Sequence, residues 1–229
     1  MKLSTYCKYI KPVIGRVLAV VGLILFFWLY LIIALCVFID DPGPVIFKQK
    51  RIGRNKNGEK AFFQIYKFRT MKTSTPDNIP THLLENPEQY ITRFGKILRR
   101  TSLDEIPQLW NIAFKHDLAF IGPRAGLYNQ DDLYEEREKY AANELTPGIT
   151  GWAQVNGRDA LEIPEKARLD GEYAEAMRKN SFSAFWMDIK CLAGTVGAIA
   201  RSQRDHEELY AGHGETDDTQ TGPVTDRST

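Results

Sequence analysis

The longest apolar stretch of this chain, VLAVVGLILFFWLYLIIALCVFI at residues 17–39, decides what kind of fold the sequence can adopt. It holds no charged side chain, and as a helix it is long enough to cross the hydrocarbon core of a bilayer. It is also longer than the apolar part of a signal peptide, and the Asp-Asp-Pro-Gly at residues 40–43 is a turn rather than a cleavage site. The stretch therefore predicts a membrane anchor, with a buried core helix as the alternative.

Basic residues flank the apolar stretch on both sides. They are Lys2, Lys8, Lys11 and Arg16 before it, and Lys48, Lys50, Arg51 and Arg54 after it. Because cytoplasmic flanks carry the excess of lysine and arginine, a helix that crosses the membrane would leave one basic flank outside. A helix that enters and returns on the same side satisfies both flanks. The charges favour a re-entrant anchor over residues 1–41, although Gly22 is the only residue inside the stretch that favours a break.

Composition bounds the rest of the molecule. The 229 residues carry 30 basic and 29 acidic side chains, so no nucleic-acid partner is expected. Cys7, Cys36 and Cys191 lie far apart, as is typical of buried thiols in a reducing compartment. We expect an α+β fold: the N-terminal membrane helix, a compact and mainly helical cytoplasmic catalytic domain with a small β-hairpin over residues 42–200, and a disordered polar tail over residues 201–229.

A basic segment follows the anchor. VIFKQKRIG and KAFFQIYKFRTM are rich in strand formers. The residues between them, Arg-Asn-Lys-Asn-Gly at residues 54–58, are typical of a turn, so the segment predicts a β-hairpin. Alternation places Phe63, Ile65, Lys67 and Arg69 on one face. The basic side chains could form a solvated face, contact anionic lipid headgroups or bind nucleic acid. Proximity to the anchor favours lipid, with Lys67 and Arg69 turned towards a phosphate.

Adjacent acids stand out in RRTSLDEIPQLWN, residues 99–111. Ser102 and Glu105 have the spacing of a capping box, and the apolar residues that follow recur at helical spacing, so we expect a helix to begin here. This gives Asp104 and Glu105 a purely structural explanation. The alternative is that both carboxylates take part in chemistry.

Two turns present an arginine. LAFIGPR reads as a short strand that ends in Gly-Pro-Arg124, and LTPGITGWAQVNGRD is a glycine-rich loop that ends in Asn-Gly-Arg158. The guanidinium group matches the geometry of phosphate oxygens. A carboxylate that attacks a diphosphate needs such cations, together with a divalent metal, to offset the negative charge. Further on, residues 182–200 predict an interfacial or core-packed helix.

The ordered motifs VIFKQKRIGRNKNGEKAFFQIYKFRTM, RRTSLDEIPQLWN, FIGPR and LTPGITGWAQVNGR resemble the bacterial sugar transferase family, over residues 13–192. More narrowly, they are similar to the small monotopic phosphoglycosyl transferases. The resemblance implies transfer of a sugar-1-phosphate from a UDP-sugar to undecaprenyl phosphate with release of UMP. It further implies a covalent phosphosugar-aspartyl intermediate, a requirement for Mg²⁺, and initiation of an exopolysaccharide, O-antigen, capsule or glycoprotein glycan.

Carried over by position, the resemblance makes Asp104 the nucleophile and Glu105 a catalytic residue that binds Mg²⁺. The substrate-binding residues would be Lys67, Arg99, Arg124, Arg158 and Asp188. It places the catalytic domain at the cytoplasmic face of the bacterial inner membrane, in contact with membrane lipids, in the minimal form without further N-terminal membrane helices. A homodimer is left open.

The sequence departs from the family at two places. Phe27 and Trp28 stand where members often carry the Ser-Pro that bends the anchor helix, so a bend here needs another cause. Ala125 stands where members often carry a second proline after Gly-Pro-Arg. Two other functions stay open: a membrane-anchored scaffold that has lost catalysis, and a hydrolase that passes the phosphosugar of a nucleotide sugar to water.

Overall fold

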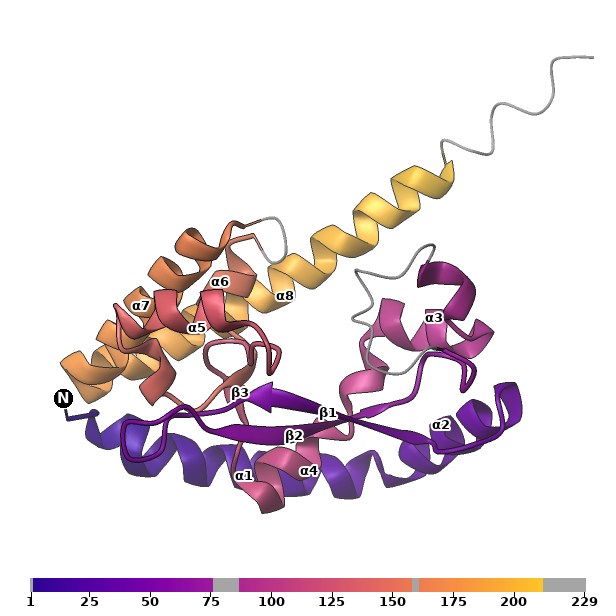
Figure 1. Cartoon of the computed structure of the whole chain (residues 1–229), viewed down its shortest axis with the longest axis horizontal. Helices are drawn as coiled ribbons and strands as arrows, with labels where there is room; N and C mark the ends of the chain where they lie inside the picture. Colours follow the sequence, from indigo (N-terminus) through magenta and orange to yellow (C-terminus); the bar gives the residue numbers. More distant parts are fainter. Residues whose placement is uncertain (1, 76–86, 158–160, 212–229) are drawn as a thin grey trace, which may run out of the picture.

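The computed structural model describes residues 2–75, 87–157 and 161–211, and the side chains of residues 199–211 lie outside the description (Figure 1). The fold is α+β and mainly helical, as expected. Its N-terminal half contains η1 (Tyr6–Ile10), α1 (Lys11–Leu25), α2 (Phe27–Asp40), β1 (Ile46–Ile52), β2 (Phe62–Phe68), η3 (Pro87–Tyr90), α3 (Arg93–Thr101), η4 (Leu103–Glu105), α4 (Gln108–Trp110) and η5 (Asn111–Lys115). Its C-terminal half contains β3 (Ala119–Ile121), α5 (Asp131–Glu138), η6 (Ala142–Glu144), β4 (Gly148–Thr150), α6 (Trp152–Val155), α7 (Ile163–Lys179) and α8 (Ser181–Ala211).

The apolar stretch is two helices rather than one. The helical direction changes by 64° between Tyr6–Leu25 and Phe27–Asp40, with Phe26 at the break. Among the described residues, no single helix has the length and hydropathy to cross a membrane, whereas this bent pair together has the composition of a broken span or a re-entrant loop. The bend forms at Phe26, directly before the Phe27 and Trp28 that stand in place of the Ser-Pro, so it does not require a proline.

Packing supplies a cause for the bend. Ala19 of α1 is buried in a cluster with Ile65 of β2 and with Leu118, which directly precedes β3. Ile33 of α2 belongs to a different cluster, centred on Phe68 and on α3. Since α1 and α2 bury their inner faces in separate clusters, tertiary packing favours a change of direction between them.

The predicted β-hairpin is confirmed. β1 and β2 pair antiparallel from Ile46 opposite Phe68 to Ile52 opposite Phe62. Directly opposed residues of antiparallel strands lie on the same face of the sheet. The pairings of Arg51 with Phe63 and of Phe47 with Lys67 therefore put Arg51 and Lys67 on one face, although they come from different strands.

The C-terminal helices form the second half of the core. A buried cluster joins β3, η6, α7 and α8 around Tyr173, Met177 and Cys191. The N-terminus is attached to the corner between α7 and α8, where the Tyr6 amide donates to Ser181 Oγ at 3.1 Å. β3 and β4 pair in parallel, with Ala119 opposite Gly148. The three cysteines are free thiols, as expected, but only Cys191 is buried, and Cys7 and Cys36 are partly exposed.

The predicted boundary of the C-terminal tail at residue 201 does not match the end of α8. This helix continues to Ala211 (yellow in Figure 1), and residues 212–229 lie outside the described part of the chain. Residues 201–211, RSQRDHEELYA, are short of large apolar side chains but contain no proline or glycine, and arginine, glutamine and glutamate are good helix formers. Low hydrophobicity alone was therefore a poor indicator of where the helix ends.

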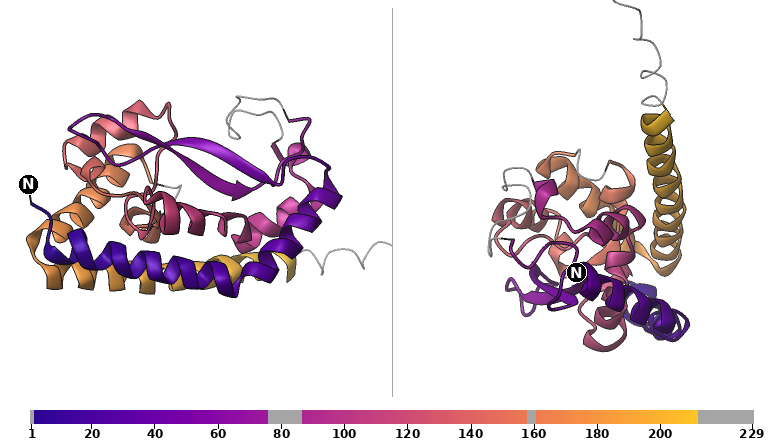
Figure 2. Two further views of the ribbon diagram at one scale, coloured as in Figure 1. Left: turned by 90° about the horizontal axis from the view of Figure 1, so that it is seen from below. Right: turned by 90° about the vertical axis from the view of Figure 1, so that its right-hand side faces the viewer.

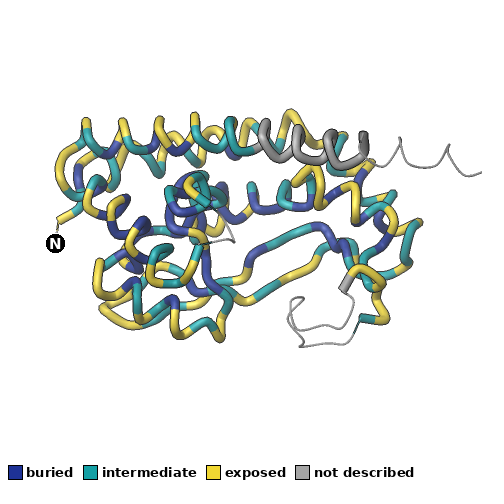
Figure 3. The backbone as a smooth tube through the Cα atoms, turned by 90° about the horizontal axis from the view of Figure 1, so that it is seen from above, coloured by how far each residue is buried: buried dark blue, intermediate teal, exposed yellow. Residues whose placement is uncertain are grey.

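One edge of the molecule carries an extensive set of exposed apolar side chains. The left view of Figure 2 places α1 and α8 along this edge and the β1–β2 hairpin along the opposite one. Exposed positions recur along both helices (yellow in Figure 3). They include Val13, Val17, Leu18, Val21, Ile24 and Leu25 in α1, and Phe182, Phe185, Trp186, Ile189, Leu192 and Val196 in α8. Of the two alternatives for residues 182–200, core packing is met on one face of α8, because Ala184 and Cys191 are fully buried, and the interfacial setting stays a prediction.

Candidate active site

The adjacent acids follow the end of α3 and lie in the short 3-10 helix η4, rather than at the start of a long α-helix. Ser102 is the C-terminal cap of α3, with a left-handed φ of 57°, and its side chain does not cap η4. The predicted capping box is therefore wrong, because an N-cap residue has extended backbone angles and accepts a hydrogen bond through its side chain, and Ser102 does neither. The helical periodicity beyond it is met only by short turns, η4, α4 and η5, rather than by one continuous helix.

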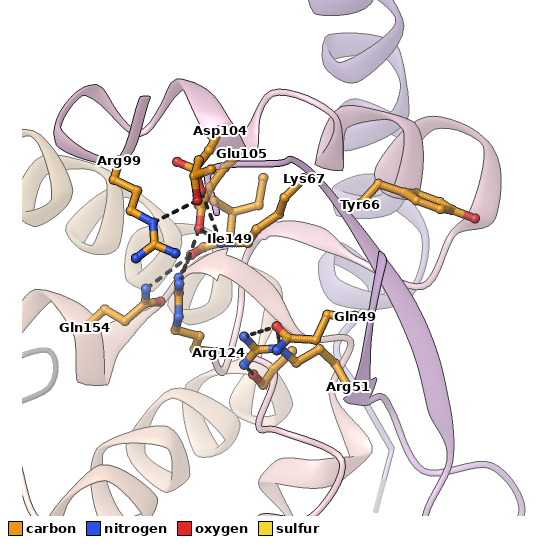
Figure 4. A network of polar contacts seen from close by, with 12 residues as sticks. Gln49, Arg51, Tyr66, Lys67, Arg99, Asp104, Glu105, Arg124, Ile149 and Gln154 are labelled. Carbon is orange, nitrogen blue, oxygen red and sulfur yellow. Dashed lines mark hydrogen bonds and ion pairs between the residues drawn. The ribbon is translucent and has the colours of Figure 1, made fainter. Parts of the chain in front are cut away.

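Lys67 of β2 forms ion pairs with both acids. Its Nζ lies 2.6 Å from Oε1 of Glu105 and 3.7 Å from Oδ2 of Asp104 (Figure 4). Asp104 is buried, with 8% of its surface exposed. The side chain of Glu105 is likewise mostly enclosed, with 19% exposed. A lysine on the face of the hairpin thus converts two neighbouring carboxylates into one charged cluster.

The two acids have opposite pKa shifts. Burial raises the pKa of Asp104, and Glu105 adds to the rise, while Lys67 and Arg99 oppose it. Burial acts in the same direction on Glu105, but Lys67 and Arg124 outweigh it and lower the pKa of that carboxyl below its usual value. A carboxylate with a raised pKa is a stronger base and nucleophile, whereas one with a lowered pKa stays ionised. This difference suits two distinct roles.

Two arginines complete the cluster around the acids. Arg99, in the last turn of α3, donates from Nε to Thr70 Oγ1 at 2.8 Å, and its charge acts on Asp104 (Figure 4). Arg124 donates from Nη2 to Glu105 Oε1 at 3.3 Å and from Nη1 to the carbonyl of Ile149 at 3.1 Å. The prediction that a short strand delivers Arg124 is confirmed, since β3 ends three residues before it.

Glycines let the backbone around Arg124 close tightly. Gly148 of β4 lies so near Gly122 that a Cβ atom on either residue would overlap backbone atoms of the other segment. The Gly148 amide also donates to the carbonyl of Pro123 at 3.0 Å. The glycine-rich loop is therefore a shaped element that fixes the turn bearing Arg124, rather than a spacer.

A small pocket opens at this cluster. Its lining residues are Arg51, Ile65, Lys67, Glu105, Gln108, Arg124, Ala125 and Gly148. Sequence reasoning missed Arg51 and Gln108. The signal for Arg51 was the strand alternation itself, because antiparallel register places it on the same face as Lys67. Burial and the nearby Arg124 lower the pKa of Arg51 to about 10, and Glu105 offsets part of that effect.

One of the predicted site residues does not join this cluster, and another lies outside the described residues. Asp188 lies in a buried group on α8, where it accepts hydrogen bonds from Tyr173 at 2.6 Å, from Tyr6 at 2.9 Å and from Lys11 at 2.9 Å. These contacts tie the N-terminal helix to α7 and α8, which indicates a structural role. Arg158 lies outside the described residues. The roles assigned to the other five, Lys67, Arg99, Asp104, Glu105 and Arg124, stay predictions, although the structure brings these five together.

The described residues contain no group of three or more histidine, cysteine or acidic side chains that could enclose a metal ion. Mg²⁺, however, is commonly held by one or two carboxylates together with phosphate oxygens of the substrate. Asp104 and Glu105 offer such a partial site, and both cationic contacts of Glu105 fall on Oε1. The donor set fits a metal that is completed by a bound diphosphate.

Comparison with known proteins agrees with the motifs. Residues 6–202 match the family described as bacterial sugar transferase. The chain is 38% identical over 161 residues to "Uncharacterized sugar transferase EpsL" of Bacillus subtilis (strain 168), covering 70% of this chain and 72% of that protein. It is 38% identical over 172 residues to "Exopolysaccharide production protein PSS" of Rhizobium leguminosarum bv. phaseoli, covering 72% and 82%.

A longer relative has a more specific name. The chain is 36% identical over 201 residues to "UDP-glucose:undecaprenyl-phosphate glucose-1-phosphate transferase" of Escherichia coli (strain K12), covering 85% of this chain but 41% of that protein. This chain thus spans less than half the length of that relative. Because the family match extends from the N-terminal helix pair through the motifs that converge on Lys67 and the two acids, the chain belongs to the bacterial sugar transferase family.

Proposed function

We propose that this protein is a phosphoglycosyl transferase, which moves a sugar-1-phosphate from a UDP-sugar to undecaprenyl phosphate and releases UMP. The observation that carries the proposal is the cluster of Asp104 and Glu105 around Lys67, in a member of this family. The names of relatives from Escherichia coli and Xanthomonas campestris, both UDP-glucose:undecaprenyl-phosphate glucose-1-phosphate transferases, support the same donor and acceptor classes. The product would be the first lipid-linked sugar of a polysaccharide.

Asp104 is the proposed nucleophile. One Oδ atom attacks the β-phosphorus of the UDP-sugar, the bond from that phosphorus to the bridging oxygen breaks, and UMP leaves with the bridging oxygen. The phosphosugar is then held on Asp104 as an acyl phosphate ester. An oxygen of undecaprenyl phosphate attacks the same phosphorus in the second step, and the Asp104 carboxylate is released unchanged. Its raised pKa supports the assignment, because basicity and nucleophilicity rise together.

The surrounding cations make the attack feasible. Arg51, Lys67, Arg99 and Arg124 are four basic side chains beside two acidic ones, which leaves a formal excess of positive charge around the pocket. The diphosphate of a UDP-sugar carries a negative charge on each phosphate, so it complements this excess. In a partly enclosed site such fixed charges stabilise the charge that accumulates during displacement.

Mg²⁺ is part of the proposal, with Glu105 as its main protein ligand and Asp104 as a neighbour. When bound, the ion would neutralise phosphate oxygens and act as a Lewis acid. Glu105 suits this role because Lys67 and Arg124 keep it ionised, which leaves the carboxylate available near neutral pH.

The apolar edge formed by α1 and α8 supports a membrane-embedded setting with both basic flanks on the cytoplasmic side. Apolar surfaces of this extent mark sites of membrane or protein contact, and the bent pair Tyr6–Leu25 and Phe27–Asp40 fits a helix that enters and returns. We expect tags at the N-terminus and after Thr229 both to be protected from external protease in intact cells. Digestion of only the N-terminal tag would show a crossing helix instead.

The test is UMP release by the purified full chain from a set of UDP-sugars, with and without undecaprenyl phosphate. We expect sustained release only when both the acceptor and Mg²⁺ are present, and loss of release on chelation. Equal sustained release without the acceptor would identify a nucleotide-sugar hydrolase. No release from any donor would favour the scaffold.

A further inference from the structure

Gln108 is the most unusual buried side chain of the pocket. It lines the pocket with 1% of its surface exposed, and its Nε2 has no hydrogen-bond partner among the described residues. Buried amide groups are almost always paired, since an unpaired donor in a low-dielectric interior loses its hydration without replacement. Such a group is retained at a cost to stability, and a ligand that accepts its hydrogen bond would remove that cost.

A second buried amide in the same segment shows what a structural role looks like. Asn111 is fully buried, and its Nδ2 donates to the carbonyl of Gln64 at 2.7 Å and to Asp117 at 3.1 Å. Its Oδ1 accepts from the amide of Tyr66 at 3.1 Å. Asn111 is therefore paired at both ends and links the hairpin to η5. Gln108, three residues earlier, has no comparable structural task for its donor.

Arg51 provides a cation at the same pocket. Its guanidinium group donates to Gln49 Oε1 at 2.7 and 3.0 Å and to the carbonyl of Ala125 at 3.0 Å (Figure 4). Each of these acceptors is neutral, so they orient the group without cancelling its charge. Orientation of a desolvated guanidinium by neutral partners is what an anion site requires.

The contacts give the pocket two ends. Asp104 contacts Lys67, Lys67 contacts Glu105, and Glu105 contacts Arg124. Arg51 and Arg124 both line the pocket, and Figure 4 shows Arg51 on the side of Arg124 away from Asp104. A diphosphate with its β-phosphate at Asp104 would direct its other phosphate away from the nucleophile towards Arg51, and the Gln108 side chain lines the same pocket.

We propose that Gln108 and Arg51 form a subsite for the α-phosphate of the nucleotide, the phosphate that leaves as part of UMP. The Nε2 of Gln108 donates to a phosphate oxygen after rotation about its last side-chain torsion, which is soft. Arg51 supplies charge and further donors to the same group. This subsite rests on the proposed function and deepens it, because it stabilises the leaving group rather than the attacked phosphorus.

The test uses Gln108→Met in the full chain, with UMP as the probe. Methionine keeps the approximate volume and removes the donor, so the ligand-free protein should melt at the wild-type temperature or above it. Its Kd for UMP should rise by about tenfold or more, as expected for a lost hydrogen bond to a charged acceptor. Its affinity for uridine, which has no phosphate, should not change.

Gln130→Met is the matched control. Gln130 accepts from the Leu127 amide at 3.3 Å through Oε1 and does not line the pocket. We expect it to lower the melting temperature and to leave the Kd for UMP unchanged. Arg51→Lys keeps the charge but loses the planar guanidinium group. It should also weaken the binding of UMP more than the binding of uridine.

The outcomes separate this inference from the proposed function. If the wild-type protein makes product and binds UMP, while Gln108→Met binds UMP equally well, the subsite is wrong and the function stands. A lower melting temperature of Gln108→Met with unchanged UMP affinity would assign Gln108 a packing role and likewise overturn the subsite. Wild-type turnover without measurable UMP affinity also contradicts it. If the wild-type protein neither turns over any UDP-sugar nor binds UMP, both proposals fail.

Discussion

Lys67 is the side chain on which the charge balance of the site depends, and Lys67→Met tests that balance. The substitution removes the cation that lies 2.6 Å from Glu105 and 3.7 Å from Asp104. Among the described residues, Arg124, at 3.3 Å, is then the remaining cationic contact of Glu105. The side chains of Lys67 and Glu105 are 18% and 19% exposed, so solvent screens their interaction only in part.

The expected loss of stability follows from these contacts. A hydrogen bond to a charged group is worth about 1.5–3 kcal/mol, and the remaining contact with Arg124 keeps the effect below that of a fully broken buried ion pair. For a chain of this length the loss corresponds to a decrease in melting temperature of roughly 3–12 °C. Activity should also fall, because the diphosphate loses a compensating charge.

The loss of stability in Lys67→Met should depend on pH. The pKa of Glu105 is lowered in the folded state, so its pairing stabilises the protein at pH values above the unfolded-state pKa. That contribution is lost as the pH falls through the lowered pKa. The difference in melting temperature between wild type and Lys67→Met should therefore be full at neutral pH and should shrink in acid.

The assay is thermal unfolding in detergent over a series of pH values, with Lys48→Met as the control. Lys48 is exposed on the neighbouring strand, 6.0 Å from the centre of the Tyr66 ring, and its loss should have little effect. Equal melting temperatures for wild type and Lys67→Met at neutral pH would refute the reasoning. So would a difference that persists unchanged after Glu105 is protonated.

Two further substitutions test other parts of the account. Asp104→Asn should raise the melting temperature near neutral pH, because burial raises the pKa of Asp104 and the ionised carboxylate costs folding free energy at pH values above the folded pKa. The gain should disappear as the pH falls below the unfolded pKa. Melting curves over a pH series test this, and destabilisation at neutral pH would contradict it. Asp188→Asn should destabilise the protein by about 3–5 kcal/mol, because it leaves the mostly buried Lys11 without its counter-charge. Limited proteolysis should then cut the N-terminal helix faster, and unchanged cleavage would argue against the structural role of Asp188.

Local patterns predicted much of the fold. The hairpin followed from period-two alternation on both sides of a turn, and the strand before Arg124 followed from an apolar run that ends in Gly-Pro. Lys67 could be placed on the site face for the same reason. These features depend on neighbouring residues, which a sequence displays directly.

Features that depend on distant contacts were not predictable in this way. Ser102 looks like a helix start, and only the packing of α3 against η4 makes it a left-handed cap. The bend beside Phe27 arises because α1 and α2 bury against separate clusters. Gln108 resembles any helix residue until its donor is found buried without a partner. Asp188 sits in a motif of the family, but two of its contacts, from Tyr6 and Lys11, come from residues more than 170 positions away at the N-terminus.

The central claim is that Asp104 carries the phosphosugar between donor and acceptor. The most direct measurement is the intact mass of the full chain after incubation with a UDP-sugar and Mg²⁺ in the absence of undecaprenyl phosphate. We predict a mass increase equal to one phosphosugar on the wild-type protein, its loss when undecaprenyl phosphate is added, and no increase on Asp104→Asn. Product formation by a wild-type protein that never carries the adduct, or a normal yield of adduct on Asp104→Asn, would contradict the account.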